Sequence, residues 1–447
     1  MDREPVNRPI SRRQFTQLGA AGAIAAAGLP RLAGASSRRY SNPAFRRAQE
    51  AMKLSFFYPV GVAGPLAQVM QGMVDSFNAE HPDIQVEASF TGSYADTSTK
   101  VQTTVQADNP PDVAVLLATD QQTMLDLDAI YPVSDLESNE LFDPDDFRPA
   151  YWADTQADGK TWSVPFQRST PVLYYNKTAL EGAGLDPETP PETWDDLVAF
   201  SKEIMAAGGA RWGVEIPSTT SAYWLFQALA IQSGQTLKGE DPAHVNFDTP
   251  AAVEALTWMV GLSTKEAVMP TGAIDWSAGP TDFSSATTAF LYHSTGSLVS
   301  INSQAKFEFG TAFLPKNKEF GVPTGGGNMY VFRDIPEDRR QAAWTFVQWM
   351  TSTEQATHWS LESGYVPTRM SVTETQEWKD YVAETPQATT ALEQLEYAQR
   401  ELTGHQSAQL QKIMDDAIQA AVTEQASPED ALRNAQEQAD SILSQFR

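Results

Sequence analysis

Residues 54–117 read LSFFYPVGVAGPLAQVMQGMVDSFNAEHPDIQVEASFTGSYADTSTKVQTTVQADNPPDVAVLL. The apolar periodicity of this stretch predicts three strands separated by two helices. In chain order, the predicted elements lie at 54–58, 66–77, 84–90, 94–106 and 113–117. Strands that alternate with helices are typical of a parallel α/β sheet, which binds ligands beyond the carboxyl ends of its strands. We therefore expect an α/β fold.

A second series of elements begins near Tyr151. We expect a strand at 171–176, a proline-rich turn at 187–191, and a helix that Thr193 caps. Further strands are expected at 309–314 and 329–332, and helices within 223–269, 337–360 and 385–447, the last with a break at Pro428. The apolar stripe of the C-terminal helices favours packing against a neighbouring domain over a coiled coil.

The N-terminus carries the features of an export signal. Ser11-Arg12-Arg13-Gln14-Phe15-Thr16 precedes an apolar run over 18–29 and the small-residue site Ala33-Gly34-Ala35. These features predict a twin-arginine signal peptide at 1–35. The alternative is a chance Arg-Arg pair beside an alanine-rich helix. A basic, flexible spacer is expected at 36–49, and the exported chain is expected to work in the periplasm without a lipid anchor.

Composition excludes several classes of function. The chain has 31 Lys and Arg against 57 Asp and Glu, a net charge of −26, which disfavours nucleic acid and anionic membranes. It has no cysteine, so disulfides, thiol nucleophiles and thiolate metal sites are excluded. The five histidines lie far apart and lack metal-ligand spacing. We therefore expect neither a metal nor another cofactor.

Residues 163–197, SVPFQRSTPVLYYNKTALEGAGLDPETPPETWDDL, resemble the hinge-crossing block of the family 1 extracellular solute-binding proteins. These proteins are the capture subunits of ABC sugar importers. Other segments that resemble the family, in the same order, are FNAEHP at 77–82, STGSL at 294–298, GGGNMYV at 325–331 and SGYVP at 363–367. The resemblance covers nearly all of residues 50–447, and the joint occurrence of these segments is specific although each one alone is not.

The resemblance implies a type II periplasmic-binding-protein fold. In that fold two lobes, each a mixed, mostly parallel sheet flanked by helices, are joined by hinge strands. We expect lobe 1 to comprise 50–168 and 295–340, and lobe 2 to comprise 169–294 and 341–447. The ligand would lie between the lobes.

Within the family, the chain is most similar to members that bind glycerol-3-phosphate. The resemblance implies a pocket made of a tyrosine after a Gly-x-Tyr turn, two serines, a glycine and a second tyrosine. At matching positions this chain has Tyr94, Ser169, Ser297, Gly326 and Tyr365. Trp224, with Tyr223 beside it, lies where the family places stacking aromatics. Turn hydrogen bonds, hinge packing and core packing are the alternative roles of these residues.

Two departures from the family pattern concern charge. Ala118 stands where the family has a glutamate, with Asp120 two residues further on. The stretch Glu401-Leu402-Thr403-Gly404-His405 lacks the arginine that neutralises phosphate in the family. Arg168 is a candidate replacement as an anion ligand, with an ion pair as its alternative role, and His405 is another candidate. A neutral sugar, a polyol or a phosphodiester therefore competes with a phosphomonoester.

We expect a capture protein that closes on a sugar, polyol or glycerol-phosphate-type ligand and then docks on the membrane subunits of an ABC permease. Glycerol-3-phosphate or a glycerophosphodiester is favoured by the resemblance, and a neutral mono- or oligosaccharide is the alternative. We expect a monomer. A secreted carbohydrate-active enzyme would need two carboxylates flanking a cleft, and none of the pocket motifs contains such a pair, so no catalytic residue is expected. A binding protein that serves a sensor remains a third possibility.

Overall fold

A computed structural model describes residues 51–62, 64–136 and 143–447. These residues belong to one unit, Glu50–Arg447, which is described here by itself. The predicted signal peptide at 1–35 and spacer at 36–49 lie outside the described residues, so both stay predictions. In the described part of the chain, no helix combines the length and the apolar character needed to cross a bilayer.

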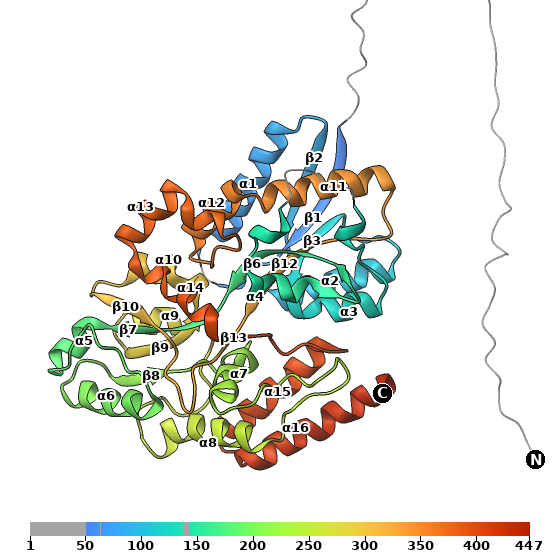
Figure 1. Cartoon of the computed structure of the whole chain (residues 1–447). Coiled ribbons are helices and arrows are strands. Elements are labelled where there is room, and N and C mark those ends of the chain that lie inside the picture. Colours follow the sequence, from blue (N-terminus) through green and yellow to red (C-terminus); the bar gives the residue numbers. More distant parts are fainter. Residues whose placement is uncertain (1–50, 63, 137–142) are drawn as a thin grey trace, which may run out of the picture. The chain divides into compact units, whose positions relative to one another are not determined.

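The first sheet has five strands in the order β2-β1-β3-β12-β6 (Figure 1). Its strands are β1 (Met52–Tyr58), β2 (Ile84–Phe90), β3 (Val113–Leu117), β6 (Val164–Ser169) and β12 (Gly325–Val331). β1 runs parallel to β2 and β3, whereas β12 is antiparallel to β3 and β6. The sheet is therefore mixed, and its three N-terminal strands are those predicted from residues 54–117.

Helices cover both faces of this sheet. One face is covered by α1 (Leu66–Glu80), α11 (Glu337–Met350) and α12 (Thr353–Ser363), whose apolar residues pack in one cluster with β1 and β3. The other face is covered by α2 (Tyr94–Gln106) and α3 (Gln121–Asp126). The predicted amphipathic helix is confirmed, because α1 buries Leu66, Met70 and Phe77 together with Met73 and Val74.

The second sheet has four strands in the order β10-β7-β9-β8. These are β7 (Pro171–Asn176), β8 (Trp212–Glu215), β9 (Thr288–Ser294) and β10 (Phe309–Ala312). Every residue of β7 and β9 is buried, because helices cover both faces. β9 is antiparallel to β7 and parallel to β8.

Several of the helices that follow β6 in the chain begin with a polar cap. Thr193 caps α6 (Trp194–Ala206) through a capping box with Asp196, as predicted. The other helices here are α5 (Lys177–Gly182), α7 (Ala222–Gln232), α8 (Pro250–Thr264), α9 (Gly279–Ser284), α10 (Leu298–Gln304), α13 (Gln376–Glu384) and α14 (Thr390–Gln394). Every residue of α7 is buried, so this helix is a central core element.

The C-terminal helices α15 (Ser407–Val422) and α16 (Pro428–Leu443) pack against α7 and α8, as the apolar stripe predicted (Figure 1). The helical expectation for 385–447 is wrong at the short strand β13 (Ala398–Gln399), which pairs with β11 (Val322–Pro323). The break expected at Pro428 is confirmed, because Pro428 starts α16. The remaining short elements are α4 (Pro149–Trp152), β4 (Gln156–Ala157) and β5 (Lys160–Thr161).

Two segments pack on a different sheet from the one that their predicted lobe contains. β10 pairs with β7 and α10 packs beneath it, so 298–312 belongs with the second sheet. α11 and α12 belong with the first sheet, because the apolar face of α11 packs on β1, where the Phe56 and Phe346 rings are 5.1 Å apart. The division into two lobes therefore remains a proposal, with its limits moved to follow the sheets.

Candidate functional site

A cavity of about 660 Å³ opens where strands of both sheets end. Residues at or just after the ends of β1, β3, β6 and β9 line it, together with the first turn of α2 and residues of α7 and α15. Its position agrees with the rule that α/β sheets bind ligands beyond strand ends. We call it the main cavity.

Five of the seven predicted site residues line the main cavity: Tyr94, Ser169, Trp224, Gly326 and Tyr365. They come from α2, β6, α7, β12 and the segment after α12. The fold thus brings together residues that are far apart in the sequence. Their contact with a ligand remains a prediction.

Two tyrosines form one wall of the main cavity. Ser93 caps α2 in a capping box with Asp96, which makes Tyr94 the first residue of the helix. The Tyr94 hydroxyl donates a 2.8 Å hydrogen bond to Gln167 Oε1. Burial raises the pKa of Tyr365 to about 12, so its hydroxyl is protonated at neutral pH and can donate a hydrogen bond.

Two tryptophans face the main cavity from another side. The Trp224 indole donates from Nε1 to the Thr324 carbonyl at 2.9 Å, and a Cβ at Gly325 would lie 2.4 Å from its ring. Trp276 has its ring centroid 6.1 Å from that of Trp224 and 4.0 Å from that of His293. The sequence analysis missed Trp276 because it lies in a polar loop without periodicity. The pair offers apolar ring surface to a carbon skeleton.

Gly326 is required by close packing of backbones. Its φ is +88°, and a Cβ there would lie 1.9 Å from the Gln167 carbonyl oxygen. A side chain is excluded on both grounds. Close approach of two backbones therefore explains the glycine at this position.

Ser297 and Arg168 do not line the main cavity, and we correct both predictions. Ser297 Oγ forms a 2.8 Å hydrogen bond with His293 Nδ1 beside α10 and is buried. Arg168 is 0% exposed, and its guanidinium donates to Asp154 Oδ2 at 2.6 Å and to Asn328 Oδ1 at 3.1 Å. Its neighbour Ser169 faces the cavity, because successive side chains of a strand point to opposite faces. The ion pair was the alternative role of Arg168.

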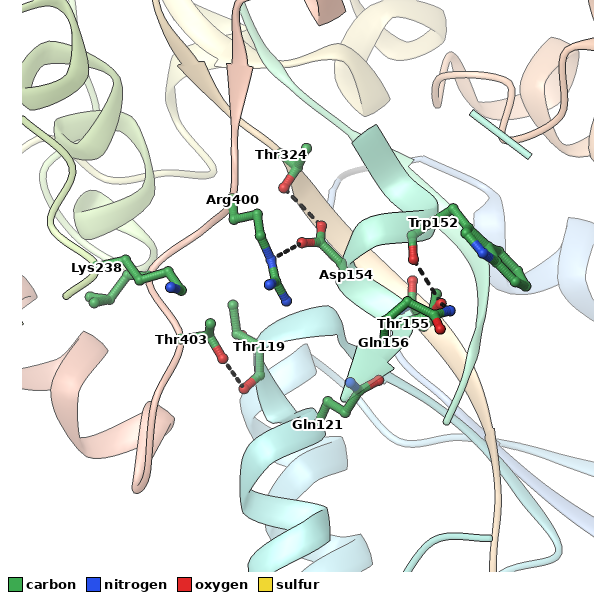
Figure 2. A network of polar contacts seen from close by, with 12 residues as sticks. Thr119, Gln121, Trp152, Asp154, Thr155, Gln156, Lys238, Thr324, Arg400 and Thr403 are labelled. Carbon is green, nitrogen blue, oxygen red and sulfur yellow. Dashed lines mark hydrogen bonds and ion pairs between the residues drawn. The ribbon is translucent and has the colours of Figure 1, made fainter. Parts of the chain in front are cut away.

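The Asp154 carboxylate is shared by several partners (Figure 2). Besides Arg168, it accepts hydrogen bonds from Arg400 Nε at 3.1 Å and Thr324 Oγ1 at 2.9 Å. A side cavity of about 290 Å³ adjoins this network, and Lys238 and Arg400 are among its lining residues. Figure 2 shows the Lys238 ammonium group pointing toward Arg400, and burial, together with the charge of Arg400, lowers the pKa of Lys238.

Two buried carboxyl groups line the main cavity, and sequence reasoning assigned neither of them to the site. Asp120 follows β3, and burial raises its pKa to about 7. Glu401 follows β13, and burial raises its pKa to about 8. Both lie in stretches that depart from the family's charge pattern. Those departures were the feature of the sequence that could have identified the two carboxyls as site residues. Glu401 also lines the side cavity, so it separates the two cavities.

Tyr223 and Asp415 support Glu401 from the side of α7 and α15. The Tyr223 hydroxyl donates to Glu401 Oε1 at 2.7 Å, and its backbone N–H donates to Asp415 Oδ1 at 2.7 Å. Burial raises the pKa of Asp415 to about 6. His405, the other candidate anion ligand, instead bonds Asp126 at 2.8 Å and stacks on Phe446.

A search for metal-binding groups gives no candidate. Across residues 51–62, 64–136 and 143–447, no three or more His, Cys, Asp or Glu side chains are grouped so that they could hold a metal ion. The main cavity instead offers hydroxyl groups, aromatic rings and carboxyl groups. These groups are suited to hydrogen bonding and stacking with a polar organic ligand.

Residues 72–386 match the model of a protein family described as bacterial extracellular solute-binding protein. The sn-glycerol-3-phosphate-binding periplasmic protein UgpB of Yersinia pestis bv. Antiqua is 28% identical over 404 residues, covering 86% of this chain and 91% of that relative. UgpB of Escherichia coli K12 is 27% identical over 420 residues, covering 89% of this chain and 94% of that relative.

Solved structures with the same fold include two with bound ligands. UgpB of Mycobacterium tuberculosis in complex with glycerophosphocholine has a TM-score of 0.78 at 23% identity, covering 89% of this chain and 99% of that one. Maltose-bound MalE3 of Thermotoga maritima has a TM-score of 0.78 at 23% identity, covering 88% of this chain and all of that one. These similarities confirm the predicted type II periplasmic-binding-protein fold.

Proposed function

The chain belongs to the family of bacterial extracellular solute-binding proteins, and we propose that it captures a sugar, polyol or glycerol-phosphate-type solute for a membrane permease of an ABC importer. The observation that carries the proposal is the main cavity, which lies at the ends of both sheets and is lined by hydroxyl groups and aromatic rings. Such groups form hydrogen bonds and stacking contacts with hydroxyl-rich molecules.

Closure of two lobes is the proposed mechanism of capture. The chain passes from β6 of the first sheet to β7 of the second at Thr170, which is fully buried. It crosses again between β10 and β12. Segments that cross between two lobes can act as hinges, and a ligand that contacts both lobes favours the closed form.

Several further properties belong to the same proposal. We propose that the protein is exported to the periplasm by a twin-arginine signal, works as a monomer and performs no catalysis. A glycerophosphodiester or glycerol-3-phosphate is supported by the similarity to UgpB proteins. A neutral saccharide is the second candidate, supported by the cavity carboxyl groups.

A ligand screen tests the proposal. We expect one member of a panel of saccharides, polyols and glycerophosphate compounds to raise the melting temperature, because a ligand bound only by the native state stabilises it. The same compound should reduce the radius of gyration in solution scattering, as closure requires. Chemical turnover of the compound, or no response to any member of a broad panel, would refute the proposal.

Two hydroxyl-deletion variants locate the site. Tyr365→Phe removes the hydroxyl of a residue that lines the main cavity and should weaken binding about threefold to tenfold, the effect of one neutral hydrogen bond. Tyr381→Phe is the matched control, because its hydroxyl lies outside the main cavity and has no hydrogen-bond partner among the described residues. Equal affinity of both variants would remove Tyr365 from the site.

A further inference from the structure

The charged residues that line the main cavity are mostly acidic. They are Asp120, Glu401, Asp415, Asp416 and Lys412. The Lys412 ammonium is already bonded to Asp416, with Nζ 2.8 Å from Oδ2. Arg168 lies behind the wall and is held by Asp154. The described lining therefore holds no unpaired cation for a phosphomonoester.

Asp120 presents a carboxyl oxygen with no partner. The residue is 4% exposed, and Ser98 Oγ donates to its Oδ1 at 3.2 Å. Its Oδ2 is buried without a hydrogen-bond partner among the described residues. An unpaired buried oxygen is costly, so a ligand group that donates a hydrogen bond to Oδ2 is favoured.

Glu401 presents the same arrangement from another part of the chain. It is 3% exposed, its Oε1 accepts from the Tyr223 hydroxyl at 2.7 Å, and its Oε2 has no partner within the described part of the chain. Asp120 lies close enough for its charge to raise the pKa of Glu401. Hydrogen bonds across the two segments, such as Thr403 Oγ1 to the Thr119 carbonyl at 3.3 Å, bring them together (Figure 2).

We infer that Asp120 and Glu401 form a carboxyl pair that accepts hydrogen bonds from ligand hydroxyl groups, and that the ligand is polyhydroxylated and carries no net negative charge. This inference rests on the proposed capture function and narrows its ligand class. Asp120 ends the 3₁₀ helix η1 (Ala118–Asp120), Glu401 lies two residues beyond β13, and both residues line the same cavity.

Charge repulsion explains the selectivity. A phosphomonoester carries up to two negative charges near neutral pH, and these charges oppose ionisation of the two carboxyls and repel them once they are ionised. A ligand hydroxyl group instead gains a charge-assisted hydrogen bond to each carboxylate. A saccharide and a zwitterionic glycerophosphodiester both meet this condition.

Calorimetric titration with maltose, glycerophosphocholine and sn-glycerol-3-phosphate tests the inference. We expect maltose or glycerophosphocholine to bind at least about tenfold more tightly than sn-glycerol-3-phosphate. Asp120→Asn and Glu401→Gln should each weaken binding of that probe by about 10-fold to 100-fold, as loss of a charge-assisted hydrogen bond does. Titrations at pH ~7.5 in buffers of different ionisation enthalpy should show that binding releases protons from Asp120 and Glu401. The ligand hydroxyl groups donate hydrogen bonds and therefore favour the carboxylate form of both side chains.

Glu215→Gln is the matched control. Glu215 is also a buried carboxyl with an unpartnered Oε2 and a raised pKa, but it lies outside the main cavity. This variant should bind as the wild type does. Tightest binding of sn-glycerol-3-phosphate, wild-type affinity in both cavity variants, or absence of proton release would each overturn the inference. If no compound binds at all, the proposed function fails, and the inference falls with it.

Discussion

The Tyr223 hydroxyl donates a 2.7 Å hydrogen bond to Glu401 Oε1, which connects helix α7 to the segment that follows β13. The backbone N–H of Tyr223 also donates to Asp415 on α15. Three separate parts of the chain thus meet at one tyrosine. The result is a fixed orientation of Glu401, with Oε1 occupied and Oε2 left for a ligand.

The raised pKa values predict that the ligand-free protein loses stability as pH rises. The pKa of Asp120 is about 7 against an ordinary 3.8, and that of Glu401 is about 8 against 4.5. Between the ordinary and the raised values, the folded state keeps these protons while the unfolded chain has released them. The free energy of unfolding therefore decreases across this range and stays low above it.

A double variant, Asp120→Asn with Glu401→Gln, isolates this effect from other titrating groups. The melting temperature of the double variant minus that of the wild type should be larger at about pH 9 than at about pH 5. The reason is that the neutral amides of the variant do not titrate, whereas the wild-type carboxyls ionise. Arg168, Asp154 and Tyr223 face Glu401 in both proteins, so their contributions largely cancel. A difference independent of pH would contradict the prediction.

Trp276→Ala should weaken ligand binding by about threefold to tenfold, the contribution of one aromatic stacking contact of ~0.5–1.5 kcal/mol. The measurement is calorimetric titration with the probe found in the screen. Trp258→Ala is the control, because Trp258 stacks on Trp194 at 4.1 Å, away from the main cavity. Similar losses of affinity in the two variants would argue against ligand stacking by Trp276.

Asp154→Asn should lower the free energy of unfolding by about 3–5 kcal/mol, because it leaves the buried guanidinium of Arg168 without its carboxylate. Denaturant titration measures the loss. Glu87→Gln breaks the Lys53 pair, whose side chains are 66% and 64% exposed, and should cost less than about 1 kcal/mol. Comparable small losses in both variants would show that Arg168 does not depend on Asp154.

Gly326→Ala should destabilise the fold by at least about 2 kcal/mol, through backbone strain at φ +88° and the clash with the Gln167 carbonyl. Gly72→Ala, on α1 with no atom within 4 Å of the added Cβ, should instead leave stability equal or higher by up to about 1 kcal/mol. Thermal unfolding of both variants makes the comparison. A tolerated Gly326→Ala would mean that β12 and β6 can separate locally.

Local sequence patterns predicted the limits of a helix or strand correctly where a clear start signal was present. The limits of α2 and β3 match the predicted 94–106 and 113–117, because a capping box and a proline pair mark their starts. The predicted lobe ranges differ from the sheet assignments at α10 and α11. Both helices bury apolar residues, and an apolar face does not specify which sheet it will cover.

The site was predicted only in part, for reasons visible in Arg168 and Trp276. Arg168 stands next to a cavity residue in the sequence, but strand pleating turns it to the opposite face, where Asp154 holds it. Trp276 carries no local signal, since its position depends on contacts with Trp224 and His293. The position of neither side chain can be predicted from the residues next to it in the sequence.

The amino-acid sequence was sufficient for the α/β class, for the strands and helices of residues 54–117 and for the family, because these follow from periodicity, caps and ordered motifs. The character of the cavity emerged only in three dimensions. Asp120 and Glu401 are 281 positions apart in the sequence, and both line the main cavity because β13 and α15 return to the end of β3. Burial there raises both pKa values, and burial is a property of the packed fold.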